Sequence, residues 1–432
     1  MNCETFYESQ VHSFTPSPPL EENTETDIVI VGGGLAGLSL AFELASQSAN
    51  FVLLEGNEVA KSASGRNGGF CSPGWAAADE MILKIFGNKS SKDFCELSLE
   101  GIDWVKSMSG RSGFENIELT HGTINLSITG STGEAEGVLR EKKSLYGDTF
   151  EIISQTDLNT FVNSKMYKYG LLSNRSFHIN PLKFLLALKT TVISQGGKIF
   201  ENSRMESFYE VDNKIHVRLS NGKCIEARRL IIATGGYAGT ETGFLRSRWL
   251  PISTCIAVTA DLGAPLHEAI LKNFAFSDNR RAGNYFRKLT GNRLLWGRDI
   301  SAFNIINPQQ ICARTGKDLK LFFPELIESI GGLEKLKFDF LWSGMMAYSV
   351  SALPYVREIS PNLYALTGFG GHGLNTATVA AKIMSEHLLG LSDRIKIFKK
   401  IPLNWNGSVL GPYAAETYYQ WHKFKERQLY FR

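Results

Sequence analysis

The chain has 432 residues, which is long for a single hydrophobic core and favours two closely packed domains. Its composition, 43% hydrophobic and 21% charged, is typical of a globular protein, and the net charge of +3 gives no electrostatic reason to expect nucleic-acid binding. The longest uncharged apolar stretch, residues 28–42, contains four glycines and is too short to cross a bilayer, so no transmembrane segment is expected.

Residues 1–25 are polar and proline-containing and have no apolar signal-peptide region, so we expect an irregular N-terminal arm and a cytoplasmic protein. Phe6, Tyr7 and Phe14 are the candidates in this arm for docking on the body. The six cysteines are widely scattered without a C-x-x-C pair. Neither a metal site nor a disulfide framework is therefore expected.

The first predicted unit is a strand, a glycine turn, a helix and a second strand. Asp27–Val31 is a β-branched apolar run, and Gly32–Gly37 follows it with G-x-G-x-x-G spacing. Leu38–Ser46 has helical composition, and Phe51–Leu54 is a second apolar strand that ends on Glu55. This order is typical of a dinucleotide-binding βαβ unit.

Each residue type in this βαβ unit is needed for a physical reason. The first glycine permits the tight turn, the second lets the backbone approach a pyrophosphate, and the third lets helix and strand pack closely. The helix N-terminus offers unpaired N–H groups to the phosphates, and the Glu55 carboxylate can accept hydrogen bonds from ribose hydroxyls. The unit alone does not choose between FAD and NAD, and the alternative is a glycine-rich turn in some other α/β protein.

Residues 58–75 form a loop rich in Gly, Ser and Ala, centred on the sequence SASGRNGG at residues 62–69. A loop with so few bulky side chains allows the backbone to approach a ligand closely. Arg66 and Asn67, set among the glycines, favour a ligand-facing loop over the alternative of a flexible linker.

A second glycine-rich junction between strand and helix follows more than three hundred residues later. An apolar strand at residues 362–367 meets the sequence GFGGHGL at residues 368–374, and a helix is predicted over residues 375–389. Two helix N-termini can serve one elongated cofactor, one at its pyrophosphate and one at a ring that carries negative charge. Reduced flavin has such a ring and NAD does not, so the pair favours FAD. The other predicted elements are a helix at 79–108, a strand at 122–130, helices at 134–146 and 181–195, a strand meander at 198–234 and a β-rich region at 249–337 with a helix near 322–330.

Four motifs resemble those of the D-amino-acid-oxidase-like FAD-dependent oxidoreductases, and within that family the γ-glutamylputrescine oxidase type. They are VIVGGGLAGLSLA with Glu55, SASGRNGG, LIIATGGYA at residues 230–238 and NLYALTGFGGHGLNTA at residues 362–377. The resemblance implies an α/β fold in which a discontinuous Rossmann-like FAD-binding domain carries a β-rich substrate domain. The implied divisions are an arm at 1–25, an FAD-binding domain at 26–90, 178–248 and 343–400, a substrate domain at 91–177 and 249–342, and a tail helix at 401–432.

The resemblance also implies which residues bind FAD. The implied contacts are Gly32, Gly33, Gly34, Leu35, Ala36 and Gly37 at the pyrophosphate, Glu55 at the ribose, Ser64, Arg66, Asn67, Gly68 and Gly69 along the pyrophosphate and flavin, Met205, Thr234 and Gly235 at the adenosine, and Gly370, Gly371, His372, Gly373 and Leu374 at the flavin pyrimidine edge. Relatives that attach flavin covalently do so through a cysteine before a Tyr-Thr step. Residues 346–349 read Met-Ala-Tyr-Ser without one, so noncovalent FAD is expected.

The implied reaction is oxidation of an amine or amino-acid C–N bond by hydride transfer to flavin N5. His372 is the catalytic candidate, and the alternative is a histidine that only caps its helix. Tyr285, Trp296, Arg298 and Trp342 are candidates for the substrate pocket, with core or surface structure as the alternative; Arg298 or Arg293 would clamp a substrate carboxylate.

Three function classes stay open: an oxidase using oxygen, a flavin dehydrogenase that passes electrons to a quinone or partner protein, and a nicotinamide-dependent enzyme. The last would need a second complete fingerprint, and residues 235–239 have the wrong glycine spacing for it. Residues 293–298 lack the lysine that some relatives use for oxygen activation, which leaves oxygen reactivity open.

Overall fold

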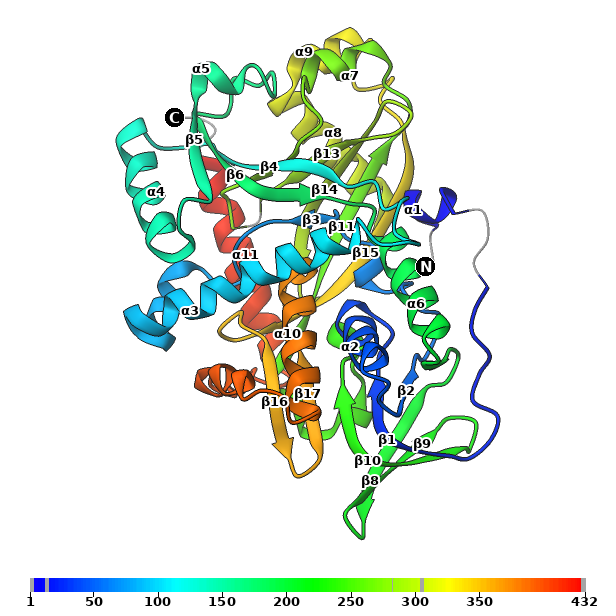
Figure 1. Ribbon diagram of the computed structural model, residues 1–432. Helices are drawn as coiled ribbons and strands as arrows, with labels where there is room; N and C mark the ends of the chain where they lie inside the picture. The colour runs from blue at the N-terminus through cyan, green and yellow to red at the C-terminus, as the bar shows by residue number, and fades with distance from the viewer. Residues whose placement is uncertain (1–3, 12–14, 282, 304–306, 429–432) are drawn as a thin grey trace.

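The computed structural model describes residues 4–11, 15–281, 283–303 and 307–428, and its strands form two sheets (Figure 1). Cys3, the proposed docking of Phe14 and the last four residues of the predicted tail lie outside the described residues. The five other cysteines are free. No helix in the described ranges is long and apolar enough to span a bilayer, and no three His, Cys, Asp or Glu side chains there are grouped as metal ligands.

The first sheet lies in the lower part of Figure 1 and is mainly parallel. Its strands are β1 (Thr24–Val31), β2 (Phe51–Leu54), β7 (Lys198–Phe200), β8 (Met205–Val211), β9 (Lys214–Leu219), β10 (Cys224–Ile232), β16 (Tyr355–Ser360) and β17 (Leu363–Thr367). The main path runs β16-β17-β10-β1-β2-β7, and the β8–β9 hairpin joins through β10. The four central strands β17, β10, β1 and β2 are parallel and apolar, as expected of strands buried on both faces.

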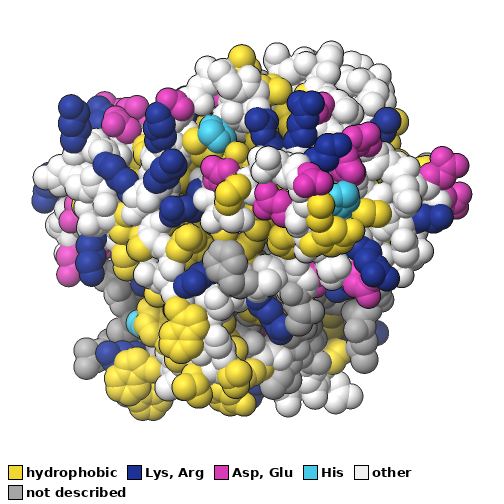
Figure 2. Space-filling model, turned by 90° about the horizontal axis from the view of Figure 1, so that it is seen from below, with side chains coloured by type: hydrophobic (Ala, Val, Ile, Leu, Met, Phe, Trp, Pro, Cys, Tyr) yellow, Lys and Arg dark blue, Asp and Glu magenta, His cyan; other side chains and the backbone are white. Residues whose placement is uncertain are grey.

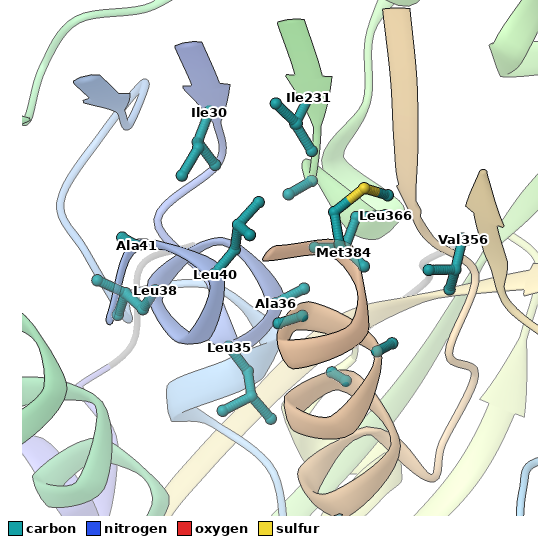
Figure 3. Packing of buried hydrophobic residues seen from close by; sticks show 14 of the residues in the cluster. Ile30, Leu35, Ala36, Leu38, Leu40, Ala41, Ile231, Val356, Leu366 and Met384 are labelled. Atoms are coloured by element: carbon teal, nitrogen blue, oxygen red, sulfur yellow. The ribbon is translucent and has the colours of Figure 1, made fainter. Parts of the chain in front are cut away.

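Helices α2 (Leu35–Ser46) and α10 (Gly373–Leu388) pack side by side on one face of this sheet, and α3 (Asp79–Met108) packs on α10. Figure 3 shows Ile30 of β1 and Ile231 of β10 facing the helices that carry Leu40 and Met384. All four side chains are fully buried. Helix α6 (Pro181–Ser194), predicted at 181–195, packs on α2, and Asn180 caps it by accepting the Lys183 N–H.

The second sheet fills the upper part of Figure 1 and is mainly antiparallel. Its strands are β3 (Phe70–Cys71), β4 (Thr120–Ser127), β5 (Phe150–Ser154), β6 (Tyr169–His178), β11 (Trp249–Thr259), β12 (Ala275–Asp278), β13 (Tyr285–Leu289), β14 (Arg293–Ser301) and β15 (Phe338–Ser349). The path is β15-β11-β14-β13-β12-β4-β6-β3, with β5 beside β6 and a single parallel pair, β12 with β4, among the described strands. A separate aromatic core joins this sheet to the helices α7 (Ala264–Ala269), α8 (Pro308–Phe322) and α9 (Pro324–Ser329).

The α/β class with a Rossmann-like sheet and a second, β-rich sheet is confirmed. Three strands do not follow the predicted domain limits. β3 belongs to the second sheet although it falls within 26–90, β6 extends one residue past 177, and β15 crosses residue 343. The domain boundaries themselves stay a prediction.

Several element predictions need correction. The N-terminal arm is not wholly irregular, because Phe6–Ser9 forms the short helix α1, which Thr5 caps. The prediction near 322–330 found α9 but missed α8, and the predicted tail helix begins only at Gly411. The predicted helix at 79–108 is present and is kinked at Gly87, where φ is +71°.

The C-terminal helix α11 (Gly411–Gln428) lies along the end of β14. Its Glu416 carboxylate accepts hydrogen bonds from the Ser301 hydroxyl and the Ala302 N–H, both at 3.0 Å. Large hydrophobic side chains are exposed along this C-terminal segment, at Trp405, Val409, Leu410, Tyr413, Tyr418, Trp421 and Phe424. Hydrophobic side chains also gather at the lower left of the face seen from below in Figure 2.

Candidate active site

A cavity of about 940 Å³ opens between the two sheets, at the upper end of the size range of ligand pockets. Its walls include the turn after β1, the loop at 62–68, the turn after β10 and the turn after β17. The carboxyl ends of parallel strands therefore converge on it, as is usual for ligand sites in open α/β sheets.

The first glycine turn has the geometry that its spacing predicts. Gly32 has φ of +118°, and a Cβ there would lie 2.6 Å from the Ala233 carbonyl oxygen. A Cβ on Gly37 would lie 1.9 Å from the Gly32 carbonyl oxygen, so the third glycine permits the close packing of helix and strand. At the start of α2, Ser64 Oγ accepts the Leu35 N–H at 2.9 Å, whereas the Ala36 N–H has no partner within the described residues.

Glu55 lines the cavity and also holds the glycine turn in place. Its carboxylate accepts the Gly33 N–H at 2.7 Å and the Asn57 N–H at 2.9 Å. Burial raises the pKa of this carboxyl, and the two N–H donors oppose that effect. The predicted ribose contact would therefore add to a structural role that the sequence did not indicate.

The turn after β17 is fixed from the second sheet. The Gly370 N–H donates to the Ala347 carbonyl and the Gly371 N–H to the Tyr348 hydroxyl, both at 2.9 Å and both on β15. The start of α10 remains open, because His372 at its N-cap makes no side-chain cap bond.

The alternative interpretation, in which the His372 side chain only caps its helix, therefore does not agree with the structure. Its Nε2 lies 2.8 Å from the Ser72 carbonyl oxygen, and a carbonyl only accepts, so Nε2 carries the proton. Burial lowers the pKa of this imidazole, which keeps the ring neutral. A catalytic role, which stays a prediction, would have to use Nδ1.

Most predicted site residues line this one cavity. They are Gly32, Gly34, Leu35, Ala36, Glu55, Ser64, Arg66, Asn67, Gly68, Met205, Thr234, Gly235, Gly370, Gly371, His372, Gly373, Leu374, Tyr285 and Trp342. Gly33, Gly37 and Gly69 lie behind this lining; a Cβ on Gly69 would lie 2.0 Å from the Ile179 carbonyl oxygen, so this glycine serves backbone packing.

Trp296 and Arg298 do not line the cavity, which corrects two pocket predictions. The Trp296 ring is fully buried in the aromatic core of the second sheet, stacked on Phe286 with ring centroids 4.9 Å apart. The Arg298 guanidinium pairs with Asp318 at 3.0 Å. The other suggested carboxylate clamp, Arg293, is likewise bound, to the carbonyl of Thr259 and to a carboxylate on β15.

Other residues of the site were missed. Arg281 lines the cavity and makes no ion pair within the described residues, and Tyr348 of β15, also in the lining, accepts the Gly371 N–H of the turn after β17. Lys142 and Asp79 form an ion pair of 2.7 Å in the cavity wall. Arg281, Lys142 and Asp79 belong to no motif, and Tyr348 was considered only for the missing cysteine before it, so the sequence gave no reason to select them.

The chemistry of the cavity fits FAD. The open N-termini of α2 and α10 present unpaired N–H groups and partial positive charge to the same cavity, as a pyrophosphate and an anionic flavin ring require. The buried Thr234 Oγ1, also in the lining, has no partner among the described residues and is available to a ligand. The lining residues in the described ranges include no cysteine, which agrees with noncovalent binding.

A two-sheet fold with two glycine turns on one cavity defines a flavin-dependent oxidoreductase. Comparison with known families agrees: the model described as "FAD dependent oxidoreductase", DAO, matches residues 27–387. The chain belongs to this DAO family, which confirms the resemblance of its motifs and FAD as its cofactor.

The chain is similar to named relatives over nearly its full length. It is 27% identical to a probable oxidoreductase OrdL of Haemophilus influenzae, covering 95% of this chain and 94% of the relative. It is 24% identical to gamma-glutamylputrescine oxidoreductase of Escherichia coli, covering 93% and 92%. Among solved structures, glycine oxidase from Geobacillus kaustophilus matches with a TM-score of 0.70 at 18% identity, covering 86% of this chain and 96% of that one, which shows the shared fold.

Proposed function

We propose that this enzyme oxidises a C–N bond of an amine or amino acid. The observation that carries the proposal is one cavity with two open helix N-termini and with Arg281, in the connection between β12 and β13, which makes no ion pair within the described residues. Relatives named as a gamma-glutamylputrescine oxidoreductase and glycine oxidases support the choice of C–N bonds. When bound, FAD supplies the hydride acceptor at N5, and the substrate leaves as an imine that water hydrolyses.

The protein's part is to orient the substrate and to keep its amine neutral. Burial disfavours a charged ammonium group, so a buried cavity lowers the pKa of a bound amine. Asp79 does not oppose this effect as a free anion, because its carboxylate is held by Lys142 at 2.7 Å and by the Tyr146 hydroxyl at 3.0 Å.

Arg281 favours substrates that carry a carboxylate. Its side chain lines the cavity and has no acidic partner within the described residues, whereas the neighbouring Arg280 is paired with Asp278. An unpaired guanidinium forms strong, charge-assisted hydrogen bonds with a carboxylate. Amino acids and γ-glutamylated amines therefore fit better than bare diamines.

The electron acceptor distinguishes two versions of the proposal. Molecular oxygen would make the enzyme an oxidase, and a quinone or partner protein would make it a dehydrogenase. Lys142 is the one lysine among the described lining residues, and its ion pair with Asp79 removes it as a free cation. This observation favours the dehydrogenase as the second candidate.

The test uses the yellow holoenzyme mixed anaerobically with a panel of amino acids, γ-glutamylated amines and diamines. Bleaching of the flavin absorbance by a carboxylate-bearing amine would support the proposal, and bleaching by none of the panel would refute it. Air or a quinone is then admitted, and the faster reoxidant identifies the acceptor.

Arg281→Gln should raise KM for the active substrate about 10- to 100-fold, the usual worth of a charge-assisted bond. Arg218→Gln, which changes an exposed arginine on the β9 hairpin, is the matched control and should leave KM unchanged.

A further inference from the structure

The loop at residues 66–69 is held by its carbonyl groups. The carbonyls of residues 66, 67, 68 and 69 accept hydrogen bonds, in that order, from Trp342 Nε1 at 2.7 Å, the Tyr7 hydroxyl at 2.9 Å, Arg287 Nε at 2.9 Å and the Ile179 N–H at 2.9 Å. Because four successive carbonyl groups each accept a hydrogen bond from outside the loop, the orientation of the backbone at residues 66–69 is fixed. The three side chains that hold it come from α1, β13 and β15, which are far apart in the sequence.

Arg287 is a buried cation that has no carboxylate partner among the residues that the structure describes. Its side chain is 2% exposed, and besides the loop it donates to His178 Nδ1 at 3.0 Å, the Tyr7 hydroxyl at 3.2 Å and the Ile179 carbonyl at 3.1 Å. These partners are all neutral, and Arg287 makes no ion pair within the described part of the chain. Its positive charge therefore acts directly behind the loop, in a region from which water is excluded.

The anchored carbonyls determine where the amide N–H groups point. In a trans peptide unit the C=O and N–H point in opposite directions, so fixing one carbonyl fixes the N–H of the following residue. The Gly69 N–H donates a hydrogen bond within the loop, to Asn67 Oδ1 at 2.8 Å. The N–H groups of Asn67 and Gly68 have no partner among the described residues, and both residues line the cavity.

We propose that Tyr7, Arg287 and Trp342 are positioning residues that hold the Asn67 and Gly68 amides toward the bound flavin, with the Arg287 charge behind them. The proposal deepens the proposed function and rests on it. Reduced flavin is anionic, so fixed donors and a nearby cation stabilise it more than the oxidised ring. The arm that carries Tyr7 would thus help to set the reduction potential.

Tyr7→Phe tests the proposal by removing one hydroxyl while keeping the ring, which packs edge-on to Trp342 with centroids 5.7 Å apart. Tyr167→Phe is the matched control: this tyrosine is also fully buried, but it lies in the core of the second sheet and outside the cavity lining. FAD affinity is measured by titrating the apoprotein, and the reduction potential by equilibration of the holoenzyme with a reference dye.

Tyr7→Phe should weaken FAD binding about fivefold, the usual effect of losing one hydrogen bond, and should make the flavin potential more negative. Tyr167→Phe should have the same FAD affinity and the same flavin reduction potential as the wild type. Wild-type affinity and potential in Tyr7→Phe would overturn the proposal, even if that variant were less stable. Trp342→Phe, which removes the donor to the Arg66 carbonyl, provides the same comparison if Tyr7→Phe does not fold. A wild-type protein that takes up no FAD would instead refute the proposed function.

Discussion

His178 should make the stability of the protein fall in mild acid. The imidazole is 1% exposed, its Nε2 lies 3.3 Å from the Asn273 carbonyl oxygen, and its Nδ1 accepts a hydrogen bond from Arg287. Burial, followed by repulsion from the Arg287 cation, lowers the pKa of His178 from 6.5 to about 3.

The direction and size of this change in the free energy of unfolding follow from proton linkage. At pH 5 the unfolded chain binds a proton at this histidine and the folded chain does not, so acid favours unfolding. The stabilisation is fully present above pH 6.5 and is lost as the pH falls toward the folded pKa of about 3. With 1.36 kcal/mol for each pKa unit, His178 alone should account for a loss of about 2 kcal/mol between pH 7 and pH 5.

The assay compares urea unfolding of wild type and His178→Gln at pH 7 and pH 5, with FAD fixed and in excess. Glutamine offers an oxygen to Arg287 and an N–H to Asn273 but does not titrate in this range. The free energy of unfolding should fall by about 2 kcal/mol less in the variant than in the wild type. An equal pH dependence in the two proteins would refute the reasoning.

Three further substitutions test other parts of the structure. Gly37→Ala places a Cβ 1.9 Å from the Gly32 carbonyl oxygen and should abolish flavin retention, seen as a colourless purified protein, whereas Gly137→Ala in the exposed helix α4 (Thr132–Tyr146) should stay yellow. Trp296→Leu should lower the free energy of unfolding by about 2–4 kcal/mol but leave KM unchanged, because Trp296 lies in the core; a raised KM at normal stability would place it in the pocket after all. Arg298→Gln should likewise leave KM unchanged while lowering the melting temperature, because it leaves the half-buried Asp318 carboxylate without this cation; a raised KM would support the predicted carboxylate clamp.

The parts of the site that the sequence predicted are those in which backbone geometry requires a residue type. Gly32 needs a positive φ, Gly37 needs room for a carbonyl, and each helix follows its glycine turn directly. These requirements are local, so spacing alone reveals them. The cofactor cradle and the first sheet were therefore predictable.

Side-chain direction on the second sheet was not predictable. In the sheet, Trp296 lies opposite Ala257 of β11, and Trp342 lies opposite Ile256, the residue next to Ala257 on the same strand. Successive residues of a strand face opposite sides, so one tryptophan enters the aromatic core and the other the cavity. A one-residue difference in register separates them, and composition contains no information about register.

The anchoring of the loop at 66–69 was also beyond the sequence. Tyr7, Arg287 and Trp342 converge from segments more than fifty residues apart, and although Tyr7 and Trp342 were candidates for other roles, nothing in the sequence linked the three to this loop. The same holds for Arg281: the structure pairs Arg280 and Arg298 with acids and gives Arg281 no ion pair within the described residues, and none of this can be read from the sequence.

The hydrogen bonds from β15 to the turn after β17 join the second sheet to the turn that is predicted to lie at the flavin. Ala347 and Tyr348 belong to the second sheet, yet they hold the amides of Gly370 and Gly371 in the first. A substrate that displaced β15 would move these two amides and so change the polarity around a flavin bound beside them before any electrons move. Ligand occupancy of the pocket should therefore be readable as a shift in the visible spectrum, which gives a direct optical screen for non-reactive substrate analogues.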